Sequence, residues 1–202
     1  MFKYSKAIYH ILKNYNFYVI PVLISEAKFY LKYNKAFNKF KYLNSEFLSD
    51  SIPCSHFFLI KIKKFVDKKD VNHICDLGSG YGKILYFFGN LNNYKIDGVE
   101  LEKEIYEYSK KLDNLNIKIF NEDILKFDLT NVQYDFFIIN DPLKKIEDFL
   151  ELILKIKKKY KKIFIIFINI NQEKIKCVND NLKTVDSFII SHNTNLLFCE
   201  IN

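Results

Sequence analysis

The chain lacks the cysteine, histidine and hydrophobic patterns that mark metal centres, disulfide frameworks and membrane spans. Its 4 cysteines are widely separated, and no two have the C-x-x-C spacing of a zinc or redox site. No apolar run reaches about 18 residues, so we expect no transmembrane helix. Lysines interrupt the N-terminus where a secretory signal would be apolar. We therefore expect a cytoplasmic protein without a bound metal, in which Cys75 and Cys199 are buried in strands.

Arginine is also absent, so that all 31 basic residues are lysine and the net charge is +7. Lysine, asparagine, isoleucine and tyrosine all have A/T-rich codons, and we therefore do not treat the basicity itself as a functional signal. The lysine patches at 61–69 and 155–162 are able to meet RNA, anionic lipid or an acidic protein, although solvated helix faces are the commoner explanation. Without arginine, bidentate phosphate binding and base reading are disfavoured.

Glycine is rare, yet 3 of the 5 glycines fall in one segment, Asp76-Leu77-Gly78-Ser79-Gly80-Tyr81-Gly82-Lys83. An apolar run precedes this segment and an apolar helical pattern follows it, which predicts a strand, a glycine turn and a helix. Such a turn accepts positive φ and approaches a ligand closely, while the helix presents its free N–H groups there. Glu100 ends the next apolar run, where a carboxylate is placed to accept ribose hydroxyls.

The glycine spacing argues against a dinucleotide. The dinucleotide fingerprint is G-x-G-x-x-G, whereas this chain has G-x-G-x-G with Asp76 two residues before the first glycine. A carboxylate there would repel a pyrophosphate and attract an α-amino group. The pattern D-L-G-S-G-Y-G-K, followed by G-V-E-L-E, resembles the class I S-adenosylmethionine-dependent methyltransferases.

Two further motifs stand in the order of that family. Asn121-Glu122-Asp123-Ile124 follows the apolar run 117–120, and Asn140-Asp141-Pro142-Leu143 follows the run 134–139. The resemblance is close over residues 71–143 and extends to the C-terminus only in the strand pattern. It implies S-adenosylmethionine as the cofactor, with Gly78, Ser79 and Gly80 along its methionine part, Asp76 at its amino group, Glu100 at its ribose, and Asp123 and Ile124 at its adenine.

The alternation of strands and helices predicts an α/β fold with a doubly wound, mostly parallel seven-stranded sheet. The last strand must be antiparallel, because three residues cannot form a crossover. We expect this methyltransferase domain over 51–202 and an N-terminal helical extension over 1–50. The expected strands are 72–76, 95–99, 117–120, 134–139, 162–169, 184–191 and 195–201, and the expected helices are 82–90, 102–112, 144–159 and 171–180.

The N-terminal region has apolar residues at helical spacing over 17–40, at positions that include Phe29, Tyr33, Phe37 and Phe40. Pro21 is expected in the first turn of this helix or at a kink. The region is either an extension packed on the core or, through residues 17–43, a substrate lid or a peripheral membrane contact. Ser55 is expected to cap a further helix over 56–68.

Asn140 and Asp141 are the candidate catalytic residues. Their motif resembles the N-P-P-Y motif of enzymes that methylate exocyclic amines, but Asp141 replaces the first proline and Leu143 replaces the aromatic residue that stacks on a base. Asn140 is suited to orient an amine and Asp141 to accept its proton. The alternative is that Asp141 and Pro142 only turn the chain into the next helix.

A second resemblance concerns the acceptor. Ile52-Pro53-Cys54-Ser55, together with the glycine motif, is similar to a subgroup that includes protein-lysine methyltransferases. The function expected is methyl transfer to a protein lysine or a small-molecule amine. RNA or DNA methylation, a non-catalytic module with this fold and a nicotinamide-dependent oxidoreductase are the alternatives. His56 is the one histidine considered as a base, against a capping or surface role.

Overall fold

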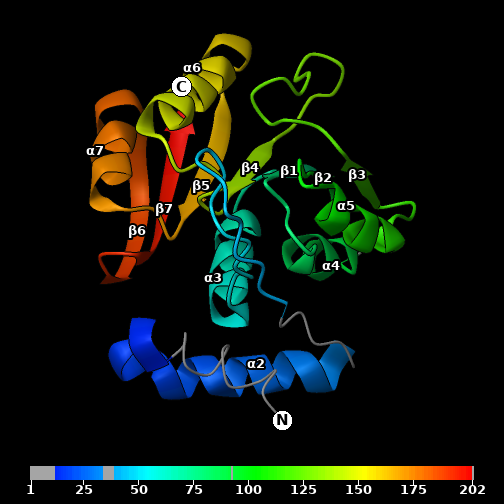
Figure 1. Cartoon of the computed structure of the whole chain (residues 1–202), viewed down its shortest axis with the longest axis vertical. Helices are drawn as coiled ribbons and strands as arrows, with labels where there is room; N and C mark the ends of the chain where they lie inside the picture. The colour runs from blue at the N-terminus through cyan, green and yellow to red at the C-terminus, as the bar shows by residue number, and fades with distance from the viewer. Residues whose placement is uncertain (1–11, 34–38, 92, 202) are drawn as a thin grey trace.

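A computed structural model describes residues 12–33, 39–91 and 93–201. Within them, seven strands form one sheet in the order β3-β2-β1-β4-β5-β7-β6, and Figure 1 shows helices on both of its faces. β7 is antiparallel to both of its neighbours, and the other pairings are parallel. The strands are β1 (His73–Leu77), β2 (Lys95–Val99), β3 (Ile117–Phe120), β4 (Phe136–Ile139), β5 (Ile163–Ile168), β6 (Lys183–Ser191) and β7 (Thr194–Ile201). The predicted fold class is confirmed.

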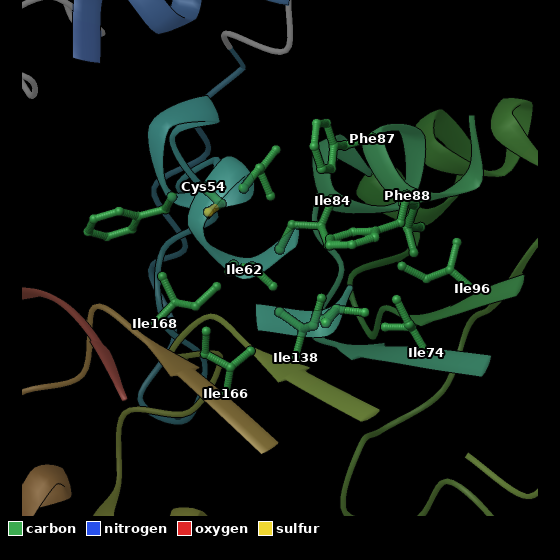
Figure 2. Packing of buried hydrophobic residues seen from close by; sticks show 14 of the residues in the cluster. Cys54, Ile62, Ile74, Ile84, Phe87, Phe88, Ile96, Ile138, Ile166 and Ile168 are labelled. Carbon is green, nitrogen blue, oxygen red and sulfur yellow. The ribbon is translucent and has the colours of Figure 1, made fainter. Parts of the chain in front are cut away.

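The central strands are mostly apolar on both faces, because helices cover the sheet from both sides, with Asp76 in β1 and Asp97 in β2 as buried exceptions. Side chains of alternate residues therefore enter two separate cores. In β4, Phe136 and Ile138 pack in the core under α3 and α4, whereas Phe137 and Ile139 pack under α6 and α7. Figure 2 shows the first of these cores. The helices are α3 (His56–Val66), α4 (Lys83–Gly89), α5 (Lys103–Ser109), α6 (Ile146–Lys159) and α7 (Gln172–Asn181).

Several expected elements are shorter than predicted, among them α3, which ends at Val66, and α6, which begins at Ile146. The helix expected over 102–112 ends at Ser109 and continues as a 3₁₀ turn, η2 (Lys110–Leu112). The strand expected from residue 134 begins at Phe136, and the side chains of Tyr134 and Asp135, just before it, join it to β1 and β2. The Tyr134 hydroxyl donates to Asp97 Oδ2 at 2.8 Å, and Asp135 Oδ2 accepts the backbone N–H groups at the start of β1.

The N-terminal helix is also shorter than predicted. A 3₁₀ turn, η1 (Asn16–Tyr18), leads into α2 (Val19–Tyr33), with Pro21 in its first turn as expected. Residues 34–38, Phe37 among them, lie outside the described residues, and Phe40 is not helical. Figure 1 shows α2 lying across the end of α3, and their contact buries Val22 and Phe29.

Residues 39–54, here called the strap, connect this region to α3 and lie against the carboxyl edge of the sheet. The strap folds back on itself through a bridge between Lys41 and Ser51. It is fixed to the segment after β4, because Ser49 N–H donates to the Pro142 carbonyl at 3.0 Å. Ser55 then caps α3 as predicted, its hydroxyl accepting the Phe58 N–H at 3.3 Å.

In the part of the chain that the structure describes, no helix has both the length and the apolar character needed to cross a membrane. The domain boundary expected at residue 50 stays a prediction.

Candidate active site

One pocket lies at the carboxyl ends of β1, β2, β3 and β4, where ligands bind in sheets of this kind. The strap forms one of its walls, with Ser51 to Cys54 in the lining. Seven of the predicted site residues also line it, and they are Gly78, Ser79, Gly80, Glu100, Asp123, Ile124 and Asn140. Asp76 and Asp141 are the two that do not.

The glycine turn adopts the conformation that its sequence predicts. Gly78 and Gly80 have φ values of +87° and +55°, and residues that carry a Cβ rarely adopt such backbone angles. There is also no room for a Cβ at Gly78, because it would lie 2.5 Å from the Cβ of Pro142. The turn and the N-D-P-L motif are therefore in direct contact, as a single shared site requires.

Asp76 lies at the end of β1 with its side chain fully buried. Neither of its carboxylate oxygens has a hydrogen-bond partner among the described residues, and the same is true of the neighbouring Ser79 hydroxyl. Burial raises the pKa of Asp76 well above its ordinary value, and the charge of Glu100 raises it further. A buried carboxylate without a partner is costly unless a cation or a donor satisfies it, so this residue suits an ammonium group.

Glu100, at the end of β2, joins two walls of the pocket. Its Oε2 accepts the Gly80 N–H at 2.9 Å and its Oε1 accepts the Glu102 N–H at 2.8 Å. Burial raises the pKa of Glu100, and these backbone hydrogen bonds act against that shift. A carboxylate has about four acceptor positions, so positions remain for two hydroxyl groups on the pocket side.

A lysine of α6 holds the turn that contains Asp123 and Ile124. Lys155 Nζ donates to the carbonyls of Ile124, Leu125 and Phe127, at 3.2, 2.7 and 2.6 Å. Asp123 Oδ1 accepts the Leu125 N–H at 2.9 Å. The start of the lysine patch at 155–162 is thus an internal brace, which the run of like charges in the sequence did not reveal.

A second pocket opens beside the first, around the ends of β4 and β5. The two pockets share Asn140 and three residues of the strap. Five asparagines line the second pocket, namely Asn14, Asn140, Asn169, Asn171 and Asn193. Its other described lining residues are Ser49, Asp50, Ile52, Asp141 and Lys144, none of which is aromatic.

Asn140 and Asn169 line this second pocket, each directly after the last residue of a strand, β4 and β5 respectively. Asn140 Nδ2 donates to the Ile52 carbonyl at 3.0 Å, which fixes the strap and turns Asn140 Oδ1 toward Asn169 Nδ2 at 3.4 Å. Asn169 has a φ of +57°, and its buried Oδ1 has no partner among the described residues. Non-glycine residues with such backbone conformations are concentrated at functional sites.

Asp141 lines the second pocket and pairs with Lys174, a buried residue of α7. Lys174 Nζ donates both to Asp141 Oδ1 and to the Leu143 carbonyl. Burial raises the pKa of Asp141, and Lys174 acts against that shift. Asp141 also has a φ of +43°, and Lys174 therefore stabilises the bend that follows β4.

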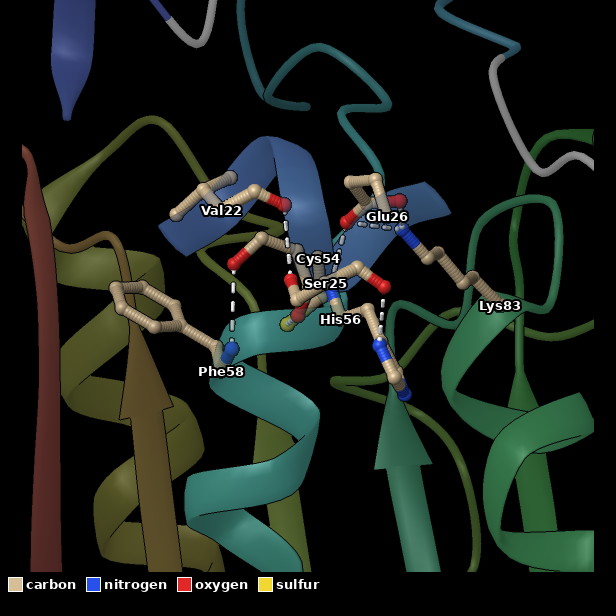
Figure 3. A network of polar contacts seen from close by, with 8 residues as sticks. Val22, Ser25, Glu26, Cys54, His56, Phe58 and Lys83 are labelled. Atoms are coloured by element: carbon tan, nitrogen blue, oxygen red, sulfur yellow. Dashed lines mark hydrogen bonds and ion pairs between the residues drawn. The ribbon is translucent and has the colours of Figure 1, made fainter. Parts of the chain in front are cut away.

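Lys83, the first residue of α4, lines the first pocket and is held by the N-terminal region (Figure 3). Its Nζ lies 2.7 and 2.9 Å from the two carboxylate oxygens of Glu26 on α2. Glu26 Oε1 also accepts the His56 N–H at 2.6 Å, and His56 Nδ1 lies 2.6 Å from the Ser25 carbonyl. His56 is buried and lines neither pocket, so its contacts are structural.

No group of histidine, cysteine, aspartate or glutamate side chains suited to a metal ion occurs within residues 12–33, 39–91 and 93–201.

Comparison with known proteins gives structural matches. No family model and no curated protein sequence matches the chain. The methyltransferase domain of bacterial CtHen1 has a TM-score of 0.58 at 12% identity, over 72% of this chain and 97% of that one. A SAM-dependent methyltransferase from Aquifex aeolicus has a TM-score of 0.56 at 14% identity, over 71% and 89%. Magnesium protoporphyrin IX methyltransferase from Synechocystis PCC 6803, solved with bound SAM, has 0.55 at 14%, over 71% and 76%.

The chain therefore has the fold of the S-adenosylmethionine-dependent methyltransferases.

Proposed function

We propose that the protein transfers a methyl group from S-adenosylmethionine to an amine, either a lysine side chain of a protein or a small-molecule amine. One observation carries this proposal. A pocket lined by Glu100 and by the glycine turn that follows the unpartnered Asp76 shares Asn140 with a second pocket, which is lined by five asparagines.

The residues of the first pocket fit the cofactor. Asp76 would hold its ammonium group directly or through water, Glu100 its ribose hydroxyls, and the turn from Gly78 to Gly80 its methionine chain. Asp123 would accept from the adenine amino group, with the Ile124 N–H near the ring. When bound, the cofactor supplies a methyl group on a positively charged sulfur, so the protein need not activate the donor.

The protein must position the acceptor and allow its proton to leave. Asn140 Oδ1 accepts from Asn169 Nδ2 and would use its second acceptor position for an amine N–H, while the unpartnered Asn169 Oδ1 would supply a further acceptor. Asp141 is the candidate proton acceptor, because it lines this pocket and burial raises its pKa. Its contact with Lys174 supports the alternative, in which it only shapes the bend.

Two observations disfavour a nucleobase as the acceptor. The described lining of the second pocket offers no aromatic ring on which a base could stack. Leu143, which occupies the aromatic position of the N-P-P-Y motif, is 3% exposed and packs in the core under α6.

The test is methyl transfer from isotopically labelled S-adenosylmethionine to lysine-containing peptides, polyamines and nucleic acids. We expect label on an amine, and we expect Asn140→Ala to lower kcat by about tenfold or more while the affinity for S-adenosylhomocysteine changes little. Asp141→Asn should lower kcat further and flatten the pH dependence if Asp141 is the base. A protein that binds the cofactor but labels no acceptor would favour the non-catalytic module.

A further inference from the structure

The outer face of α2 is apolar and exposed. Ile20, Ile24 and Leu31 have exposed fractions of 68%, 51% and 80%, and Phe17, in the turn before the helix, is fully exposed. These residues recur every three, four or seven positions, so they form one stripe on the side opposite Val22 and Phe29, which face α3. From Ile20 to Leu31 the stripe is about 16 Å long.

The charges beside this stripe have one sign. Residues 12–33 contain three lysines, Lys13, Lys28 and Lys32, all of which are exposed. The one acidic residue of this segment, Glu26, faces inward and pairs with Lys83. The outer surface of α2 therefore combines apolar side chains with positive charge and has no exposed carboxylate.

This combination favours one partner over another. In a symmetric pairing of two copies, the stripe would bring like charges together, which costs free energy. An anionic lipid surface instead accepts the apolar side chains among its acyl chains and attracts the lysines.

We propose that α2 docks the protein on an anionic membrane surface, with Phe17, Ile20, Ile24 and Leu31 inserted at the level of the lipid headgroups. The same segment reaches the second pocket, because Asn14 lines it together with Asn140. Docking through α2 would thus hold the mouth of that pocket close to the lipid surface. The proposal rests on the exposed stripe and its lysines, and it is independent of which group is methylated.

The absence of tryptophan from the chain gives a direct test. Leu31→Trp places a single reporter in the stripe, and Leu115→Trp places the matched reporter at a distant, 95% exposed position. On addition of phosphatidylcholine vesicles that contain phosphatidylglycerol, we expect the emission of Leu31→Trp to shift to shorter wavelength and that of Leu115→Trp to stay unchanged. Pure phosphatidylcholine should give a smaller shift.

Sedimentation with the same vesicles separates the two contributions. The triple variant Ile20→Ser/Ile24→Ser/Leu31→Ser should bind about tenfold more weakly or worse. Lys28→Glu/Lys32→Glu should lose at least about fivefold, whereas Lys161→Glu/Lys162→Glu, a matched change at exposed lysines beyond α6, should bind like the wild type. Circular dichroism and S-adenosylhomocysteine binding check that each variant is folded.

Equal vesicle binding by all variants, or no binding by the wild type, would overturn the proposal. A dimer in solution that the triple serine variant dissociates would also overturn it, because the stripe would then join two copies.

Discussion

Asp76 is the residue whose environment gives the sharpest test of the proposed cofactor site, although its side chain does not itself line the pocket. A carboxylate that is fully buried and has no partner among the described residues is unfavourable in its charged form. A bound ammonium group would reverse that balance, because an adjacent positive charge stabilises the ionised carboxylate. The stability of the protein and the pH dependence of cofactor binding should therefore both report on this one side chain.

Replacing Asp76 by asparagine should stabilise the ligand-free protein. Above about pH 4 the unfolded chain releases the proton of Asp76, whereas the folded protein retains it because its pKa is raised. The folded state then binds more protons, so the free energy of unfolding falls as pH rises toward that pKa. Asp76→Asn removes this loss, and its melting temperature should exceed that of the wild type by a margin that grows as the pH rises above about 4 toward the raised pKa of Asp76.

The exposed Asp70→Asn serves as the control for the change in net charge. The Asp76 substitution should at the same time weaken S-adenosylhomocysteine binding by about tenfold or more, since an ionised partner of the ammonium is lost. Stabilisation without a loss of affinity would show that Asp76 does not face the ligand.

The sequence predicts some site residues much better than others. The glycine turn is recognisable because a single short segment contains its whole motif. Glu100 is recognisable because it ends the next apolar run after that motif. Lys174 and Asn169 were missed because their roles depend on contacts across the fold, and Lys174 meets Asp141 from 33 residues away. Nothing near either residue in the sequence distinguishes a buried brace from a solvated side chain.

At the scale of secondary-structure elements, the pair between Lys83 and Glu26 joins the N-terminal region to the first pocket. Lys83 starts α4 directly after the glycine turn, and its side chain is 5% exposed against 23% for Glu26. Because Glu26 also holds the N-terminus of α3 through the His56 N–H, three helices meet at this carboxylate.

Removing only one partner of the pair between Lys83 and Glu26 should lower the stability of the folded protein. Lys83→Met leaves Glu26 partly buried without its cation, and we expect a loss of about 3 kcal/mol in the free energy of unfolding, measured by denaturant titration. The double variant Lys83→Met/Glu26→Gln should recover part of that loss, because no charge is then left without a partner. A loss in the double variant equal to the sum of the two single losses would contradict a direct interaction.

The central strands were predictable from their apolar runs to within about two residues, and the course of the strap was not. The runs that become β4 and β5 are continuously apolar, as strands covered on both faces of a sheet are. The strap has no such run. Its course depends on distant partners such as Pro142, which accepts from Ser49, and a polar stretch in the sequence gives no sign of such a partner.

At the scale of the whole molecule, the order of strands and helices was sufficient to predict a mostly parallel seven-stranded sheet with an antiparallel last strand. The three-residue separation between the last two expected strands excluded a crossover, and β6 and β7 are indeed joined by a tight turn. The second pocket was not predictable in the same way. It forms between the strap, the ends of β4 and β5 and the N-terminal segment. These segments are far apart in the sequence, and no single motif predicts that they come together.

The most direct test of this account is calorimetric titration of the protein with S-adenosylhomocysteine and, separately, with NAD. We expect the wild type to bind S-adenosylhomocysteine and not NAD, and we expect Glu100→Ala to weaken that binding by about tenfold or more. Glu107→Ala, on the exposed side of α5, should leave the affinity unchanged. Absence of S-adenosylhomocysteine binding, or equal affinity in Glu100→Ala and wild type, would contradict the assignment of this pocket to the methyl donor.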